Sequence, residues 1–267
     1  MGSFCNKLSI FNKHFLYLYS DNQVKMHKTA ALKSRFILIT LFAIAMALLE
    51  AVVVIYLREI YYPEGFSFPL HPIDEHLIVT ELFRELATLI MLLCIGLIAS
   101  KKALKRFAWF IFTFAVWDIF YYIFLKLFIG WPESLLTWDI LFLIPSTWVG
   151  PVIGPVINSM TMILLAVLIL YFRNQGYRAS LNKMEWLLLI LGSFIVILAY
   201  TEEYFRYMIR EFSFLDVFSF STNDKALSYA SKFIPQRFNW LIFTGGQFLF
   251  FSSIYSYFRR MFNRKRS

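Results

Sequence analysis

The hydrophobic and polar positions of this chain are segregated into long blocks. Several apolar blocks approach or exceed the roughly 20 residues that a helix needs to cross a lipid bilayer. They lack the alternation of apolar and polar residues that is typical of half-buried strands. A helix satisfies its own backbone hydrogen bonds within a bilayer. The pattern therefore predicts an all-α fold, a polytopic bundle of transmembrane helices.

Six spans are predicted, separated by polar or proline-containing segments. They cover residues 36–56, 77–99, 107–128, 149–172, 186–204 and 239–258. We expect a six-span membrane domain at 36–258, a cytoplasmic, disordered segment at 1–35 and a basic cytoplasmic tail at 259–267. Met26 offers an alternative start of the chain. No small-residue cleavage site follows the first span, which indicates a membrane anchor rather than a cleaved signal peptide.

One segment interrupts the regular pattern just before the fourth span. Residues 133–172 are too long for one span and barely long enough for two with a turn. Helix breakers are concentrated in the first half of this segment, at Pro145, Gly150, Pro151, Gly154 and Pro155. We therefore predict a broken segment, with a short re-entrant or interfacial helix at 135–144 before a fourth span at about 149–172.

Composition and charge support this topology. The chain is 59% hydrophobic and 16% charged, whereas a soluble domain carries about 25% charged residues. With six spans, 18 of the 26 lysines and arginines fall on one side of the membrane. Treating 135–144 as a full crossing would move the basic segment 173–183 and the C-terminus to the other side. The positive-inside rule thus predicts that both termini are cytoplasmic, and it explains the net charge of +9 without nucleic acid.

Ionisable and amide side chains converge in the outer half of the predicted bundle. At about 1.5 Å of rise per residue, every span contributes a polar group to this layer. The candidate substrate-binding or ion-binding residues are Glu50, Glu81, Arg84, Glu85, Asp118, Asp139, Asn158, Glu202, Glu203 and Gln247. Placing an ionisable group within a membrane costs free energy. Such a group is therefore interpreted by default either as part of a functional site or as a member of a buried ion pair.

The pairing of these groups can be predicted in part. Glu81, Arg84 and Glu85 share one helix face by their spacing, and we expect Arg84 to pair with Glu50 or Glu85. Carboxylates outnumber arginines in the layer, so either some stay protonated through burial or the layer binds a cation. Asp118 lies near the middle of its span, where Asn158 or Gln247 could donate hydrogen bonds to it. Alternatively, the outermost acids lie at the wet interface and the layer is purely structural.

Two copies of one short phrase bracket a turn in the middle of the chain. Trp117-Asp118-Ile119 and Trp138-Asp139-Ile140 flank Gly130-Trp131-Pro132. The stretch WDIFYY…GWPESLLTWD…P resembles one found in uncharacterised bacterial multi-pass membrane proteins. This resemblance implies a bacterial inner-membrane location, and it implies no activity.

Three functions are compatible with the sequence. The first is a non-catalytic membrane-anchoring subunit or scaffold, whose partners are the lipid bilayer and proteins of a larger complex. The second is a small cation-coupled or proton-coupled transporter that uses the acidic layer. The third is a membrane-embedded lipid-acting enzyme with Glu85 or Asp118 as acid or base. No ligand pattern indicates a metal, and no motif identifies a cofactor.

Overall fold

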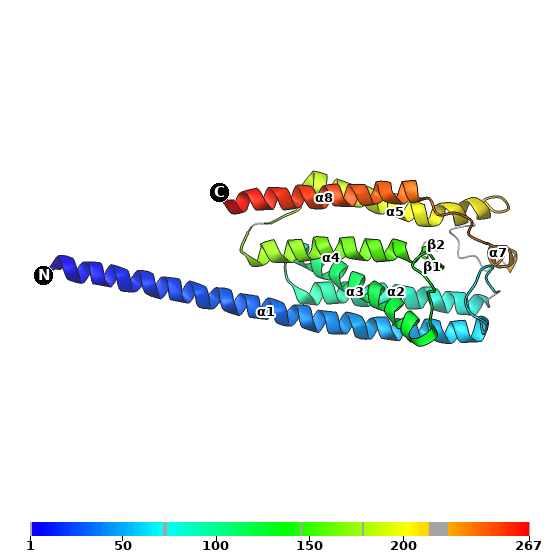
Figure 1. Cartoon of the computed structure of the whole chain (residues 1–267), viewed down its shortest axis with the longest axis horizontal. Coiled ribbons are helices and arrows are strands. Elements are labelled where there is room, and N and C mark those ends of the chain that lie inside the picture. Colours follow the sequence, from blue (N-terminus) through cyan, green and yellow to red (C-terminus); the bar gives the residue numbers. More distant parts are fainter. Residues whose placement is uncertain (1, 72–73, 145, 178, 214–223, 267) are drawn as a thin grey trace.

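The computed structural model describes the chain apart from residues 1, 72–73, 145, 178, 214–223 and 267 (Figure 1). The described elements are α1 (Gly2–Tyr61), α2 (Glu75–Ala99), α3 (Ala103–Ile129), β1 (Trp138–Phe142), β2 (Trp148–Pro151), α4 (Ile153–Asn174), α5 (Lys183–Met208), α7 (Asp224–Ala230) and α8 (Trp240–Arg266). Long helices lie side by side as a bundle, and the two ends of the chain lie toward the same end of it (Figure 1).

Five helical segments of the described chain are long and apolar enough to cross a membrane. They are Thr29–Tyr61, His76–Ala99, Ala103–Ile129, Ile153–Asn174 and Lys183–Met208. The first, second, third and fifth predicted spans lie within these segments, and the prediction of a membrane-type helical bundle is confirmed. The fourth predicted span began too early, because residues 149–151 belong to β2 and the helix starts at Ile153. The sixth predicted span, 239–258, coincides with α8 from Trp240 onward, and α8 is not among the five.

Local sequence signals explain where several helices begin and end. No glycine or proline occurs between Ser3 and Tyr62, so α1 meets no helix breaker before Pro63. Its backbone is helical from Gly2 onward. Gly130 ends α3 with a left-handed φ of 69°. Asn182 and Glu185 form a reciprocal capping box at the start of α5.

A β-hairpin replaces the helix predicted at 135–144. Strands β1 and β2 pair antiparallel, with Asp139 opposite Gly150 and Ile140 opposite Val149. The predicted re-entrant or interfacial helix is therefore wrong. Both strands contain aromatic and β-branched residues, at Trp138, Ile140 and Phe142 of β1 and at Trp148 and Val149 of β2. Such side chains favour a pleated, half-buried surface. The hairpin provides hydrogen-bond partners for backbone N–H and C=O groups. At the ends of a ten-residue helix followed by a proline, many of these groups would have no partner.

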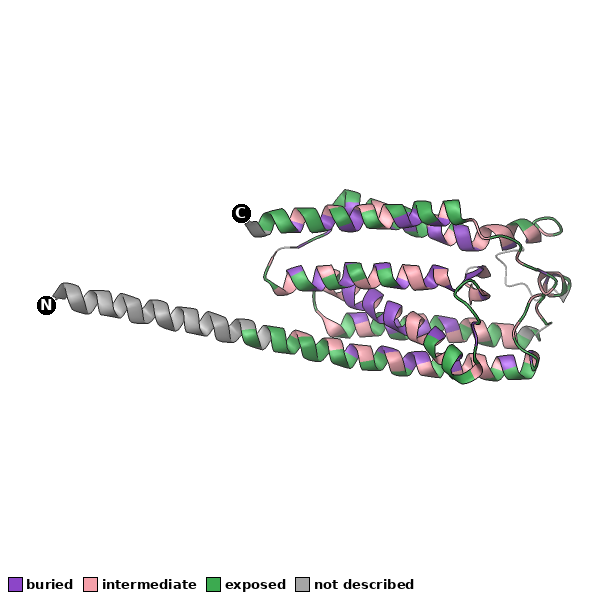
Figure 2. Ribbon diagram, viewed as in Figure 1, coloured by how far each residue is buried: buried purple, intermediate pink, exposed green. Residues whose placement is uncertain are grey.

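Helix α3 is the centre of the bundle. It packs against α1, α2 and α4, and buried residues run along it in Figure 2. Trp109 and Leu125 of α3 are essentially inaccessible to solvent, as is Ile169 of α4. This close-packed apolar core fixes α1–α4 as one unit.

Helices α5 and α8 form an antiparallel pair beside this unit (Figure 1). Glycines let their backbones approach closely, since a Cβ on Gly246 would lie 2.6 Å from Cγ2 of Val196. At the other end of the pair, Arg260 binds the fully buried Glu185 at 2.7 Å. Small residues at such contacts are typical of helices that associate within membranes.

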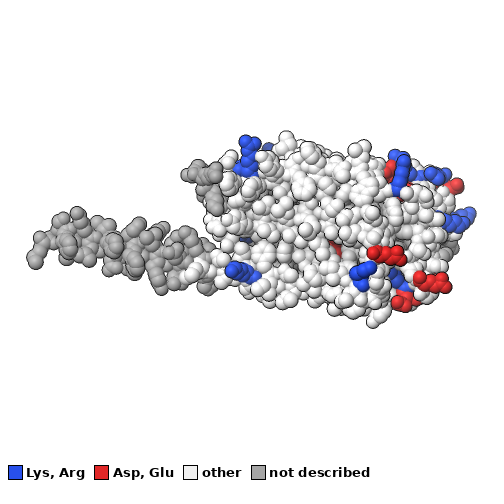
Figure 3. Space-filling model, in the orientation of Figure 1, with Lys and Arg blue, Asp and Glu red and all other residues white. Residues whose placement is uncertain are grey.

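The surface of the bundle is divided into an apolar middle and charged ends. Figure 3 shows uncharged side chains over the middle of the visible face and charged groups gathered toward its ends. Large apolar side chains are exposed on the outer faces of the helices, as at Ile98 of α2 and Phe194 of α5. This arrangement is compatible with a membrane around the bundle.

Candidate functional site

A partly open cavity of about 520 Å³ lies where the α1–α2 loop, the hairpin and α7 meet at one end of the bundle. Its walls come from α1, α2, α3 and the hairpin. Residues of α7 and of the last turns of α5 complete it. Six carboxylates and two arginines line it, namely Glu50, Asp74, Glu81, Glu85, Asp118, Asp139, Arg58 and Arg84. We call this space the acidic cavity. Its volume lies in the range of small-molecule sites.

The first charged pair of the cavity joins α1 to the hairpin. Nη2 of Arg58 lies 2.9 Å from Oδ1 of Asp139, and both side chains are buried. The hydroxyl of Tyr122 donates to the other carboxylate oxygen at 3.3 Å. The guanidinium stacks over Trp131, 3.7 Å from its ring centroid. Burial raises the pKa of Asp139 to about 6, although Arg58 opposes this shift.

The second charged group joins α1 to α2. Arg84 forms an ion pair with Glu50, and its Nε lies 2.7 Å from Oε2 of Glu81. The hydroxyl of Thr88 also donates to Glu50, at 3.1 Å. Of the two partners predicted for Arg84, the structure has Glu50. It does not have Glu85, whose carboxylate accepts the backbone N–H of Leu143 instead.

Two carboxylates of the cavity have no basic partner. Glu85 is buried, and its oxygens lie 3.0 and 3.2 Å from the amide nitrogen of Leu143. Asp118 accepts a hydrogen bond of 2.7 Å from the hydroxyl of Ser159 on α4. Within the described part of the chain, neither lies within ion-pair distance of a basic side chain. The predicted partners of Asp118 were wrong, because Ser159 faces it one position beyond Asn158.

Asn158 and Gln247 belong to a different network, outside the acidic cavity. The amide of Gln247 donates to the side-chain oxygen of Asn158, whose amide donates to the hydroxyl of Tyr200 at 2.8 Å. Thr161 donates to Gln247 at 3.2 Å. The network joins α4, α5 and α8, and polar side chains of this kind hold membrane helices together.

Glu202 and Glu203 also lie apart from the cavity, at the outer end of α5. Glu202 pairs with Arg206 one helical turn further on, at 2.7 Å. Glu203 accepts the backbone N–H groups of Gln236 and Arg237, at 2.9 and 3.2 Å. These two glutamates therefore anchor the segment that leads into α8.

Cavity residues that are absent from the candidates predicted from the sequence include Arg58, Asp74 and Trp117. Of these three, Arg58 is the one that forms a buried ion pair. It follows Glu50 by eight residues, which places both on the same face of a continuous helix. The predicted first span ended at Tyr56, so Arg58 was assigned to a loop. Extending the helix to Pro63 would have revealed it.

Apart from Nη1 of Arg84, which is ion-paired with Glu50, two buried donors of the cavity wall have no hydrogen-bond partner in the described structure. They are Nη1 of Arg58 and Nε1 of Trp117. The side chain of Trp117 is 6% exposed, and Arg58 is 8% exposed. An unsatisfied buried donor costs about 1–3 kcal/mol. Both residues line the acidic cavity, and each donor needs an acceptor that the described structure does not supply.

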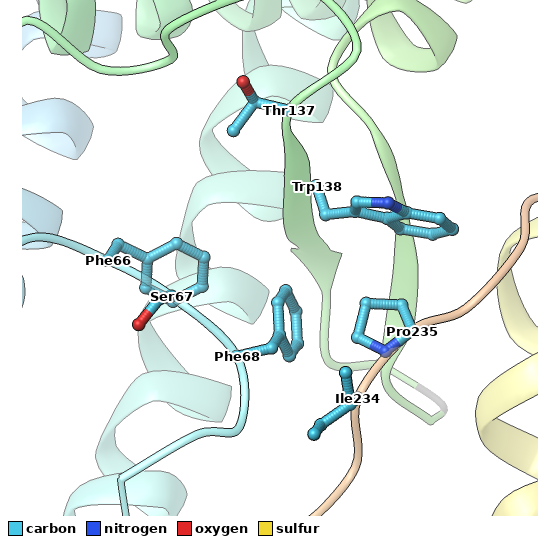
Figure 4. Close-up of a pocket in the computed structure, with 7 residues that line it drawn as sticks. All are labelled: Phe66, Ser67, Phe68, Thr137, Trp138, Ile234 and Pro235. Carbon is cyan, nitrogen blue, oxygen red and sulfur yellow. The ribbon is translucent and has the colours of Figure 1, made fainter.

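A smaller space of about 290 Å³ lies beside the hairpin. Figure 4 shows Phe66 and Phe68 of the α1–α2 loop close to Trp138 of β1, with Ile234 and Pro235 completing the wall. No ionisable side chain lines it. Of these two spaces, the acidic cavity is therefore the one lined by ionisable side chains.

The described residues include no group of three or more His, Cys, Asp or Glu side chains arranged to hold a metal ion. We found no family model, curated protein or solved structure that matches the chain. The site must therefore be interpreted from its own geometry.

Proposed function

We propose that this chain is a six-span membrane protein that binds a small molecule in the acidic cavity from the non-cytoplasmic side. The observation that carries the proposal is the cavity itself, with two carboxylates that lack basic partners and two buried donors that lack acceptors. A bound molecule with matching groups would satisfy all four.

The sixth span of this proposal is α8. Its 27 residues would extend about 40 Å, enough to cross a bilayer. It runs antiparallel along α5 with glycine contacts between them, so a membrane around α5 also surrounds α8. With six crossings, both termini lie on one side, and the positive-inside rule makes that side cytoplasmic. The location we propose is the bacterial inner membrane.

The position of the cavity favours binding from one face over transport. The cavity reaches Asp118 from the end formed by the α1–α2 loop, the hairpin and α7. Toward the opposite end, close-packed side chains such as Leu92, Trp109 and Ile169 fill the core. Alternating access would need a rearrangement of this core.

The cavity also favours binding over a purely structural layer. A scaffold gains stability from a filled interior, whereas unpaired carboxylates within a membrane are expensive and default to function. The apolar outer faces of the helices are compatible with the anchoring-subunit hypothesis as well, because they can contact either lipid or a partner protein. A lipid-acting enzyme would use the same cavity as its active site, with Glu85 or Asp118 as acid or base.

Carbodiimide labelling tests whether the cavity admits a small molecule. Dicyclohexylcarbodiimide is membrane-permeant and couples to carboxyl groups in apolar surroundings. In membranes, we expect peptide mass spectrometry to find it on Glu85 and Asp118. Ile140→Trp, which fills the cavity from β1, should reduce this labelling, and Ile190→Trp on the exposed face of α5 should not. Equal labelling in the two variants would refute the binding proposal.

A further inference from the structure

The charges that line the acidic cavity do not balance. Six carboxylates face two arginines. Asp139 is matched by Arg58, and a single arginine serves both Glu50 and Glu81, as described above. The exposed Asp74 is at the rim, where water can solvate it. What remains is the pair of carboxylates without a basic partner, Glu85 and Asp118.

The hydrogen bonds of these two carboxylates leave most of their capacity unused. An ionised carboxylate offers about four lone-pair sites. The protein supplies the backbone N–H of Leu143 to Glu85, with the backbone N–H of Ile144 also directed at it, and one hydroxyl to Asp118, from Ser159. Both groups line the same cavity. A cationic donor with several N–H groups would satisfy them, and a primary ammonium group has three donors and no acceptor.

The buried donors require the opposite chemistry. Nη1 of Arg58 and Nε1 of Trp117 are unpartnered in the described structure, and both residues line the cavity. Each can only donate, so each needs an acceptor oxygen. Trp117 and Asp118 are consecutive residues of α3, and both line the cavity despite the turn of about 100° between them. A matching ligand therefore has an ammonium group and an acceptor oxygen close together.

We propose that the acidic cavity recognises a molecule with a primary ammonium group, bound by Glu85 and Asp118, and an adjacent oxygen acceptor, bound by Arg58 and Trp117. This inference rests on the proposed binding function and specifies its ligand class. An aminoethyl phosphate group has this chemistry, either as a lipid headgroup or as a free zwitterion. The apolar part of the wall, from residues such as Val54, Leu77 and Ile140, accommodates the rest of an amphipathic ligand.

Four probes with the same ten-carbon chain separate the charge requirement from hydrophobic binding. They are decylamine, decanol, decanoate and decyltrimethylammonium. We expect decylamine to raise the melting temperature of the protein in phosphatidylglycerol nanodiscs and to block carbodiimide labelling of Glu85 and Asp118. The other three probes should do neither at the same concentration. Equal protection by decyltrimethylammonium would overturn the requirement for N–H donors.

Near-isosteric variants then test the named residues. Glu85→Gln and Asp118→Asn should each raise the Kd of decylamine at least about tenfold, the scale of one lost charged hydrogen bond. Glu203→Gln, outside the cavity, should leave it unchanged. Unchanged Kd values in the first two variants would overturn the proposal. Protection of the wild-type protein from carbodiimide labelling by decylamine is measured without any variant. This measurement therefore tests the proposal even if a variant does not fold.

The two sources of the ligand are separated by short-chain phosphatidylethanolamine and soluble phosphoethanolamine. The source that protects the carboxylates at the lower concentration is the one the cavity recognises, and protection by neither overturns the assignment of the oxygen acceptor. Trp117→Phe should weaken binding of that probe without changing the Kd of decylamine. If decanol or decanoate binds and Ile140→Trp abolishes this, the binding function stands and the ammonium assignment fails. If no probe alters labelling, the binding function itself fails.

Discussion

Arg58 near the end of α1 and Asp139 of β1 form a buried ion pair across 81 positions of the chain, with 2.9 Å between Nη2 and Oδ1. The pair fastens the hairpin to the first helix at the mouth of the acidic cavity. Aromatic rings cover the guanidinium, so water has little access to either charge. The hairpin and the cavity therefore depend on this contact.

Removing one member of the pair should destabilise the fold strongly. Arg58→Met leaves the Asp139 carboxylate uncompensated, and losing one partner of a buried pair costs about 3–5 kcal/mol. Chemical unfolding in detergent micelles measures this cost, with Arg210→Met as the exposed control. Replacing both, with Arg58→Met and Asp139→Leu together, should cost less than Arg58→Met alone. A single variant as stable as the control would contradict the buried pair.

The raised pKa of Asp139 predicts a particular pH dependence. Burial raises the pKa of this carboxyl to about 6 in the folded protein, against about 3.9 in an unfolded chain. Between about pH 4 and 6 the folded state therefore binds more protons, so this group's contribution to stability falls as pH rises and levels off above pH 6. The difference in melting temperature between wild type and Asp139→Asn should follow this curve. A difference that is constant from pH 4 to 8 would refute the shift.

Tyr200 packs so closely against the hairpin and α4 that two glycines are required. A Cβ on Gly154 would lie 2.7 Å from the hydroxyl oxygen of Tyr200, and one on Gly150 would lie 2.9 Å from its ring. Gly154→Ala should therefore cost about 1–3 kcal/mol by overpacking. In a Tyr200→Phe background the cost should shrink, because the nearest atom is gone. Gly245→Ala is the matched control, since a Cβ there meets nothing within 4 Å; additive losses would contradict the contact.

Cysteine labelling tests the six-span topology. After the natural Cys5 and Cys94 are replaced by serine, a probe cysteine at Glu64 should react with an impermeant maleimide in intact cells. Probes at Asn174 and Asn263 should react only after permeabilisation, because the proposed topology places the last turns of α4 and α8 on the cytoplasmic side. External labelling at Asn263 would exclude α8 as the sixth span.

Much of the architecture could be predicted from the sequence because membrane helices leave a strong signal. Blocks of apolar residues located the first five spans, apart from the start of the fourth, and the similar depth of the three residues predicted that Arg84 pairs with Glu50 or Glu85. The hairpin could not be predicted this way. Its ten or so residues are apolar enough for a buried helix, and only the pairing of β1 with β2 decides between the two.

The candidate site was predicted in outline but not in its pairings. The acids of the first three spans do converge, since the bundle aligns them at one depth. The partner of Asp118 is Ser159 rather than Asn158, because a one-residue step turns a helix by about 100° and changes which side chain faces α3. Depth alone carries no information on this rotation.

The most direct test of the account is a cryo-electron microscopy map of the protein extracted from its native membrane with no added ligand. The account predicts density larger than a water molecule in the acidic cavity, in contact with Glu85 and Asp118 on one side and with Arg58 or Trp117 on the other. A cavity closed by rearranged side chains, with Glu85 and Asp118 bonded only to the protein, would contradict it.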